Sequence, residues 1–294
     1  MKKALKGTGV AIVTPFHKHG TVDFTSLGKL IEHLILNGVN YIVALGTTGE
    51  TATLSEKEKL AVTDFVVDTV AKRLPVVLGL GGNNTQRIID QIKDFNFDGI
   101  DAVLSVAPYY NKPQPKGLFY HFKSIEAVLP IPMLIYNVPG RTGVNISAET
   151  TLKLAEEVSG IIGIKEASGN MMQCMQIIKD KPKDFLVISG EDALTMPLIA
   201  AGADGVISVV ANAFPKEFSE MVQLSLSENT KKARELHYKL LNFTNAVFED
   251  GSPAGIKAAL EVLELCQNNL RLPLVKVNKQ TYATIQNLVK EIIG

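Results

Sequence analysis

The sequence has no excess of charge of either sign. Its 294 residues contain 30 lysines and arginines against 30 aspartates and glutamates, so the formal net charge at pH 7 is zero. Proteins that bind nucleic acids or membrane surfaces usually carry a strong positive field. The balance argues against both kinds of partner and leaves a small molecule as the expected ligand.

The sequence is also poor in cysteine and lacks long apolar runs. Only Cys174 and Cys266 occur, each in an apolar, helix-like stretch and without CxxC spacing. This pattern indicates buried thiols in a reducing compartment. The apolar segment near the N-terminus is too short for a signal peptide, and no run reaches membrane-spanning length. We expect a cytoplasmic protein.

Several widespread site motifs are missing. No GxxxxGK[ST], HExxH or GxSxG pattern occurs. The stretch "GLGGNN" from Gly79 lacks the last glycine of a dinucleotide-binding fingerprint, and His17 and His19 have no second group of ligands near them in the sequence. We therefore expect neither a nucleotide site nor a metal site.

What recurs in the sequence is a short, β-branched apolar run. Such runs, almost continuously apolar, are typical of strands buried on both faces of a parallel sheet. Eight of them occur, at residues 9–16, 40–46, 75–81, 102–110, 132–139, 161–168, 185–192 and 205–214.

The segments between these runs predict helices. Residues 25–38 place Leu27, Leu30, Ile31 and Leu34 at helical spacing, and residues 54–73 begin with a capping-box pattern. Eight strand-helix units in order predict a closed (β/α)8 TIM barrel. A doubly wound sheet stays open as an alternative, although it requires a reversal of strand order.

The chain after the eighth unit has no further β-rich run. Residues 229–248, 253–266 and 277–293 predict three helices, and no low-complexity linker precedes them. We expect a catalytic barrel over residues 1–225 and a C-terminal helical region over residues 226–294 that packs on it.

Reactive side chains follow several of the predicted strands. In a barrel of this type, active-site groups come from the carboxyl ends of the strands and the loops that follow them. Taken singly, each group here has a plainer interpretation as a glycine turn, a packing tyrosine or a surface lysine. Their coincidence on one rim favours a site made by Thr47, Thr48, Tyr109, Tyr110, Tyr136, Arg141 and Lys165.

Lys165 ends the apolar run "IIGIK". A lysine held partly out of water at the mouth of a barrel has its charged form disfavoured, and a neutral amine attacks carbonyls to form Schiff bases. Nearby tyrosine and threonine hydroxyls could pass the protons that this chemistry needs. Arg141 offers a planar, two-pronged site for a carboxylate. Glu166 and Glu191 could serve as acid-base groups, but salt-bridged carboxylates of the rim are the commoner interpretation.

The motifs "GTTGE", "PYYNKP", "YNVPGRTG", "IIGIKEASGN", "SGEDA" and "GVISV" occur in this order. As a set, the chain resembles the dihydrodipicolinate synthase family within the pyruvate-dependent class I aldolases. The resemblance implies a lyase that condenses pyruvate with L-aspartate 4-semialdehyde, the first committed step of diaminopimelate and lysine biosynthesis. It also implies no cofactor beyond the covalent pyruvate intermediate, and at least a homodimer, with a homotetramer favoured.

The resemblance also implies residue roles. Lys165 matches the lysine that forms the Schiff base with pyruvate, and Tyr136 matches the tyrosine that relays protons and contacts the keto acid. Thr47 matches the threonine that links two tyrosines in a proton relay. Tyr110 matches the second tyrosine, which reaches in from a neighbouring subunit.

The substrate-binding positions are carried over in the same way. Thr48 matches the residue that holds the pyruvate carboxylate, and Gly190 and Ile207 match backbone positions that line the pyruvate pocket. Arg141 matches the arginine that receives the carboxylate of the semialdehyde. N-acetylneuraminate lyases and sugar-acid aldolases generally lack this arginine, so "GRTG" favours the synthase over them. A non-catalytic keto-acid-binding barrel is a further alternative, whose sign would be loss of Lys165 or Tyr136.

One departure from the family concerns feedback inhibition. Members inhibited by lysine bind it at a dimer interface, and the matching positions are Thr51, Ala52, Glu56, Asn83, Arg87 and Tyr109. Here Glu56 replaces a histidine, Arg87 replaces a glutamate and Thr51 replaces a serine, while Asn83 and Tyr109 are kept. The altered charges predict weak or absent lysine inhibition.

Overall fold

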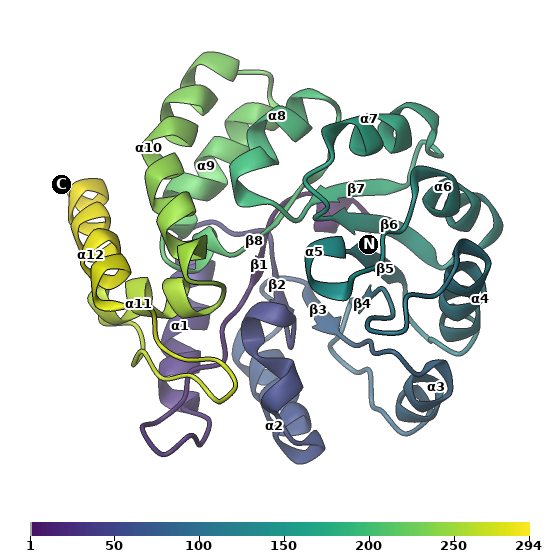
Figure 1. Cartoon of the computed structure of the whole chain (residues 1–294), viewed down its shortest axis with the longest axis horizontal. Coiled ribbons are helices and arrows are strands. Elements are labelled where there is room, and N and C mark those ends of the chain that lie inside the picture. The colour runs from purple at the N-terminus through teal and green to yellow at the C-terminus, as the bar shows by residue number, and fades with distance from the viewer. Residues whose placement is uncertain (1) are drawn as a thin grey trace.

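The computed structural model describes residues 2–294. Eight parallel strands form a closed barrel in the order of the sequence, with β1 hydrogen-bonded to both β2 and β8. The prediction of a (β/α)8 barrel is confirmed, and the strand order has no reversal of the doubly wound kind (Figure 1). The strands are β1 Gly7–Ala11, β2 Tyr41–Ala44, β3 Val76–Gly79, β4 Ala102–Val106, β5 Met133–Asn137, β6 Ile161–Glu166, β7 Leu186–Ser189 and β8 Gly205–Ser208.

Helices alternate with the strands and surround them (Figure 1). They are α1 Phe24–Leu36, α2 Glu56–Val70, α3 Thr85–Lys93, α4 Pro115–Glu126, α5 Pro139–Thr142, α6 Ala148–Glu157, α7 Met171–Asp180, α8 Thr195–Ala200 and α9 Pro215–Leu226. Helix α1 buries the four apolar residues that its periodicity predicts. At the start of α2, the Ser55 hydroxyl accepts from the Glu58 N–H and the Glu58 carboxylate accepts from the Ser55 N–H.

Two apolar layers make up the core. One lies between the strands and the helices and contains most of the buried leucines, isoleucines and valines. The other fills the inside of the barrel, with Leu5 and Tyr41 among its residues. The barrel is therefore a packed core, and a substrate can reach only the groups at its ends.

The C-terminal residues form α10 Thr230–Glu249, α11 Ala254–Val262 and α12 Lys279–Ile293. These three helices pack against one another, and α10 also packs along α9 on one side of the barrel (Figure 1). The division of the chain into two domains near residue 225 stays a prediction. Within residues 2–294, no helix has both the length and the apolar character needed to span a bilayer.

Candidate active site

Lys165 and Tyr136 lie side by side at the carboxyl ends of neighbouring strands. They are register partners in the pairing of β5 with β6. The Lys165 Nζ lies 4.3 Å from the centroid of the Tyr136 ring. Both are buried, with 6% of Lys165 and 7% of Tyr136 exposed. The structure thus places an amine and a phenol together in a site largely closed to water.

An irregularity in β6 turns Lys165 inward. Consecutive β5 residues Met133 and Leu134 pair with Ile161 and Gly163, so Ile162 is an extra residue in β6. This arrangement is a β-bulge, in which two residues oppose one on the partner strand. Ile162 belongs to the layer inside the barrel, and strict alternation from it would turn the side chain three residues later outward. Because the bulge shifts the alternation, the side chain of Lys165 shares the inside with Tyr136.

Gly190 packs against the side chain of Lys165, and Ile207 lies in the interior of the barrel. A Cβ atom at Gly190 would lie 2.9 Å from Lys165 Cε and 2.6 Å from Ala167 Cβ, so a larger residue there would displace the lysine. Ile207 is 1% exposed and belongs to the same interior layer as Tyr136. Gly190 therefore lies against the Lys165 side chain, and Ile207 belongs to the interior layer of the barrel.

The "GTTGE" segment folds into a short 3-10 turn over Thr47–Gly49 after β2. Two residues in the left-handed backbone region flank it, Leu45 with φ 54° and Glu50 with φ 53°. Thr48 is buried, whereas Thr47 is exposed. Non-glycine residues in this backbone region are uncommon and carry strain, so contacts elsewhere must hold the turn in place.

Tyr110 and Arg141 lie at the outer part of the barrel mouth. Tyr110 is 83% exposed with φ 76°, and its N–H donates to the Thr142 carbonyl at 3.4 Å. Arg141, in α5, is also exposed, and its Nη2 donates to the Ser252 carbonyl at 3.4 Å. The structure thus brings Lys165, Tyr136 and Gly190 together, whereas Thr47, Tyr110 and Arg141 are exposed and form no hydrogen bond or salt bridge with them.

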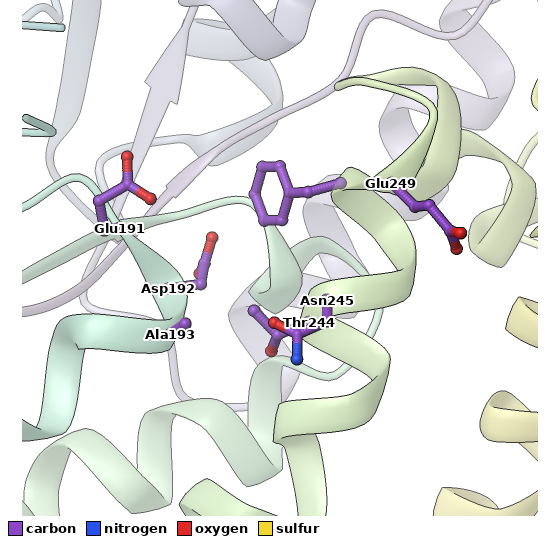
Figure 2. A pocket seen from close by; sticks show the side chains of 7 residues that line it. Glu191, Asp192, Ala193, Thr244, Asn245 and Glu249 are labelled. Atoms are coloured by element: carbon purple, nitrogen blue, oxygen red, sulfur yellow. The ribbon is translucent and has the colours of Figure 1, made fainter. Parts of the chain in front are cut away.

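A pocket of about 300 Å³ lies between the loop after β7 and the end of α10 (Figure 2). Glu191 and Asp192 line it from the barrel side, and Glu249 points away from them. Burial and the neighbouring Asp192 raise the pKa of Glu191, while the positive charges of Lys165 and Arg141 oppose that rise. The charges of Lys165 and Arg141 thus reach Glu191 at the edge of this pocket, although neither residue lines it.

Sequence reasoning missed Asp192. Burial raises the pKa of its carboxyl, against the effect of hydrogen bonds from the Ser208 hydroxyl and the Val209 N–H. Through these hydrogen bonds, the Asp192 carboxylate links the loop after β7 to the end of β8. The motif "SGEDA" contains Asp192, but the hydrogen-bond partners of its side chain lie 16 and 17 residues further along the chain, beyond the reach of a local pattern.

The interpretation of Glu166 and Glu191 as salt-bridged rim carboxylates is wrong, because neither forms a salt bridge within residues 2–294. Glu166 is 2% exposed, and no lysine or arginine in residues 2–294 forms a salt bridge with it. Its carboxylate accepts instead from Asn137 Nδ2 at 3.0 Å, the Ser168 N–H at 2.8 Å and Gln173 Nε2 at 2.8 Å. As the residue after Lys165 it faces the outside of the barrel, where it ties β6 to β5.

The six positions of the predicted lysine pocket lie around the starts of α2 and α3. The Arg87 Nη2 lies 3.7 Å from the Glu56 Oε1, so the two substituted residues face each other. Asn83 Nδ2 donates to the Tyr109 carbonyl at 3.4 Å. Thr51 and Ala52 belong to the 3-10 turn Thr51–Thr53 that precedes α2.

Neither histidine of the HxH motif joins a metal-like cluster. His17 Nδ1 lies 3.8 Å from Asp23 Oδ2, and the described residues contain no group of three histidine, cysteine or acidic side chains suited to a metal ion. Cys174 and Cys266 are both buried free thiols, as the sequence predicts. Burial raises the pKa of each to about 12, so neither is reactive at neutral pH.

Comparisons with known proteins agree with this fold. The model of the dihydrodipicolinate synthetase family matches residues 4–292. A 4-hydroxy-tetrahydrodipicolinate synthase of Parabacteroides distasonis is 49% identical over 288 residues, which cover 98% of this chain and 97% of the relative. The dihydrodipicolinate synthase of Thermotoga maritima superposes with a TM-score of 0.95 at 39% identity, covering 98% of each chain.

The chloride-inhibited dihydrodipicolinate synthase of Acinetobacter baumannii, solved in complex with pyruvate, has a TM-score of 0.95 at 40% identity. The superposition covers 98% of this chain and 99% of that one. Because the family match spans almost every residue and the fold agrees throughout, the chain belongs to the dihydrodipicolinate synthetase family.

Proposed function

We propose that the protein is a 4-hydroxy-tetrahydrodipicolinate synthase, which condenses pyruvate with L-aspartate 4-semialdehyde in the cytoplasm. The observation that carries the proposal is the buried amine of Lys165 beside the Tyr136 phenol, at the end of the barrel where such sites are built. The relatives named 4-hydroxy-tetrahydrodipicolinate synthase and the pyruvate complex of a structural relative support it.

The first half of the reaction activates pyruvate. The Lys165 amine attacks the keto carbon, and loss of water leaves an imine between that carbon and Nζ. The imine withdraws electrons from the methyl group, which then gives up a proton to form an enamine. Free pyruvate hardly loses this proton at neutral pH, so the covalent bond to lysine supplies the activation.

The second half joins the substrates. The enamine carbon attacks the aldehyde carbon of the semialdehyde, and the aldehyde oxygen gains a proton to become a hydroxyl. The amino group of the semialdehyde then attacks the imine carbon, closes the ring and displaces the Lys165 amine. No redox step or organic cofactor takes part. Tyr136, Thr47 and Tyr110 pass the protons, and Thr48 holds the pyruvate carboxylate.

Borohydride trapping tests the Schiff base directly. The protein is incubated with pyruvate and sodium borohydride, and the intact mass is compared between wild type and Lys165→Ala. We expect one stable adduct of reduced pyruvate in the wild type and none in the variant. The absence of an adduct in both would refute the aldolase chemistry and favour a non-catalytic keto-acid-binding barrel.

Arg141 distinguishes this reaction from those of related aldolases. Its exposed guanidinium at the mouth suits a carboxylate on the second substrate, whereas a sugar acid would present hydroxyls there. Purified protein given pyruvate with either the semialdehyde or N-acetylmannosamine should turn over only the semialdehyde. Turnover of the sugar alone would replace the proposal with a lyase of the N-acetylneuraminate type.

The exposed Tyr110 indicates self-association. A tyrosine that is 83% exposed cannot exclude water from a proton relay in a single chain, so we infer that a second copy covers it and that the active form is at least a dimer, with a tetramer favoured. Specific activity should fall when the protein is diluted below its dimer dissociation constant. Constant activity in a sample shown to be monomeric by sedimentation would contradict this.

The charges near α2 and α3 support insensitivity to lysine. Arg87 pairs with Glu56, so a cation and an anion stand where inhibited relatives have other residues. We expect the activity to be unchanged by lysine below millimolar concentration. Inhibition by sub-millimolar lysine would contradict this expectation without affecting the assignment of the reaction.

A further inference from the structure

Glu50 and Lys257 form an ion pair that is completely buried. The Lys257 Nζ donates to Glu50 Oε1, and both side chains are 0% exposed. Glu50 belongs to the turn after β2, whereas Lys257 lies in α11, 207 residues away in the sequence. The pair therefore joins the rim of the barrel to the C-terminal helical region.

Both ends of the pair are anchored by the chain after α11. The second oxygen of Glu50, Oε2, accepts from the Arg271 N–H at 3.1 Å. Lys257 Nζ also donates to the Asn269 carbonyl at 2.8 Å and lies 4.2 Å from the centroid of the Phe16 ring. Every strong partner of the Glu50 carboxylate thus comes from residues beyond the barrel.

Fixing Glu50 fixes the turn that carries the two threonines. The Glu50 N–H donates to the Thr47 carbonyl at 3.1 Å, and the Thr53 N–H donates to the Glu50 carbonyl at 3.0 Å. On the other side of the turn, the Thr14 hydroxyl donates to the Gly49 carbonyl at 2.7 Å. Because Glu50 itself has φ 53°, this strained conformation needs side-chain contacts to maintain it.

A buried ion pair is a poor device for stability alone. The cost of removing both charges from water often exceeds their mutual attraction, and apolar residues of similar volume stabilise as well or better. Such a pair does impose a specific geometry, because each charge accepts only a partner in the right place. Because Glu50 directly follows the turn Thr47–Gly49, this geometry holds the turn in place.

We propose that Glu50 is a positioning residue for the pyruvate-binding turn and that Lys257 sets its position. The inference rests on the proposed function, in which Thr48 holds the pyruvate carboxylate. Loss of the pair lets the turn move, so pyruvate binding weakens while the semialdehyde site at Arg141 is unaffected. Through Lys257, the C-terminal helical region thereby helps to position the active site.

The test compares two variants of the pair with a matched control. Lys257→Met removes the cation and keeps an unbranched side chain, and Glu50→Gln removes the anion with almost no change of shape. The control is Lys181→Met, because Lys181 lies 3.7 Å from Asp204 in a mostly buried pair at the opposite end of the barrel. For each protein we would measure the melting temperature, the KM of each substrate and the rate of borohydride trapping.

We expect both pair variants to raise the KM of pyruvate about tenfold or more and to slow trapping equally, with the KM of the semialdehyde within about twofold. Lys181→Met should lower the melting temperature without changing either KM. Should Lys257→Met fail to fold, Glu50→Gln still decides the question. Equal KM changes for both substrates, or none at all, would overturn the inference, while absence of trapping in the wild type would overturn the proposed function instead.

Discussion

At the amino end of the barrel, carboxylates accept N–H groups from the starts of neighbouring strands, whereas at the carboxyl end a buried amine has no ion-pair partner within residues 2–294. Asp101 accepts from the Val76 N–H at 2.9 Å, and Asp204 accepts from the Val187 N–H at 3.0 Å while pairing with the Lys6 amine at 2.7 Å. At the other end, Lys165 is buried beside a phenol and has no carboxylate within salt-bridge distance among the described residues.

Charged side chains therefore have different roles at the two ends of the barrel. A carboxylate that accepts backbone N–H groups and meets a cation has its hydrogen-bonding needs met, and it stabilises the strand ends. An amine buried without an acid to neutralise it is costly, and such a cost is usually associated with function. Substitutions at the carboxyl end should change activity more than stability, and those at the amino end should do the reverse.

The largest effect is expected for Lys165→Ala. Under the proposed mechanism this variant loses the nucleophile, so kcat should fall on the order of 10⁴-fold or more. The free energy of unfolding should be unchanged or higher, since an uncompensated buried amine is removed. Urea denaturation and steady-state kinetics measure both. A large loss of stability in this variant would break the comparison between the two ends.

Gly190→Ala comes second. The added Cβ would meet Lys165 Cε at 2.9 Å and displace the nucleophile, so kcat/KM for pyruvate should fall about 10²-fold. Gly28→Ala in α1 is the matched control, because its added Cβ meets Phe65 at an ordinary 3.4 Å. The control should keep full activity. Unchanged kinetics in Gly190→Ala would mean that Lys165 moves aside without consequence.

Arg141→Ala tests the outer part of the carboxyl end. Loss of a charge-assisted contact to the semialdehyde carboxylate should raise the KM of that substrate about 10- to 100-fold. The KM of pyruvate should change far less, because the proposed mechanism places pyruvate on Lys165 inside the barrel. Kinetics with each substrate varied in turn give the two values. Equal rises in both would show that Arg141 acts on the whole mouth and recognises neither substrate selectively.

Asp204→Asn is the counterpart at the amino end. It weakens the contact with Lys6 and the hydrogen bond from Val187, so unfolding should become easier by about 1–3 kcal/mol. Both KM values and kcat should stay within about twofold of wild type, which the same assays measure. A selective change in the KM of pyruvate would show that the amino end influences the chemistry.

The smallest effect concerns acid stability. The bidentate contact with Arg271 lowers the pKa of Glu58 to about 2. A carboxyl with a depressed folded pKa contributes stability above its unfolded pKa, and the contribution is lost as pH falls through the folded pKa. Because the side chain is partly exposed, the contribution should be less than about 1 kcal/mol. Unfolding at pH 6 and pH 2.5 should differ less in Glu58→Gln than in wild type, and an equal difference would refute the assignment.

Much of this protein could be predicted from the sequence. The eight apolar runs correspond to the eight strands, because strands buried on both faces must be apolar along their whole length. The capping box of α2 and the buried face of α1 follow from spacing over three or four residues. The order of the motifs indicated the family and pointed to Lys165, Tyr136 and Arg141.

The sequence by itself determined the elements, their order and the reactive residue types, because these depend on neighbours within a few positions. Only the tertiary structure decided that Lys165 faces inward, since the extra Ile162 shifts an alternation that spacing alone would have continued. It also decided that Glu50 meets Lys257, because no local pattern links residues 207 positions apart. Burial forces that pairing, since neither charge could remain there without the other.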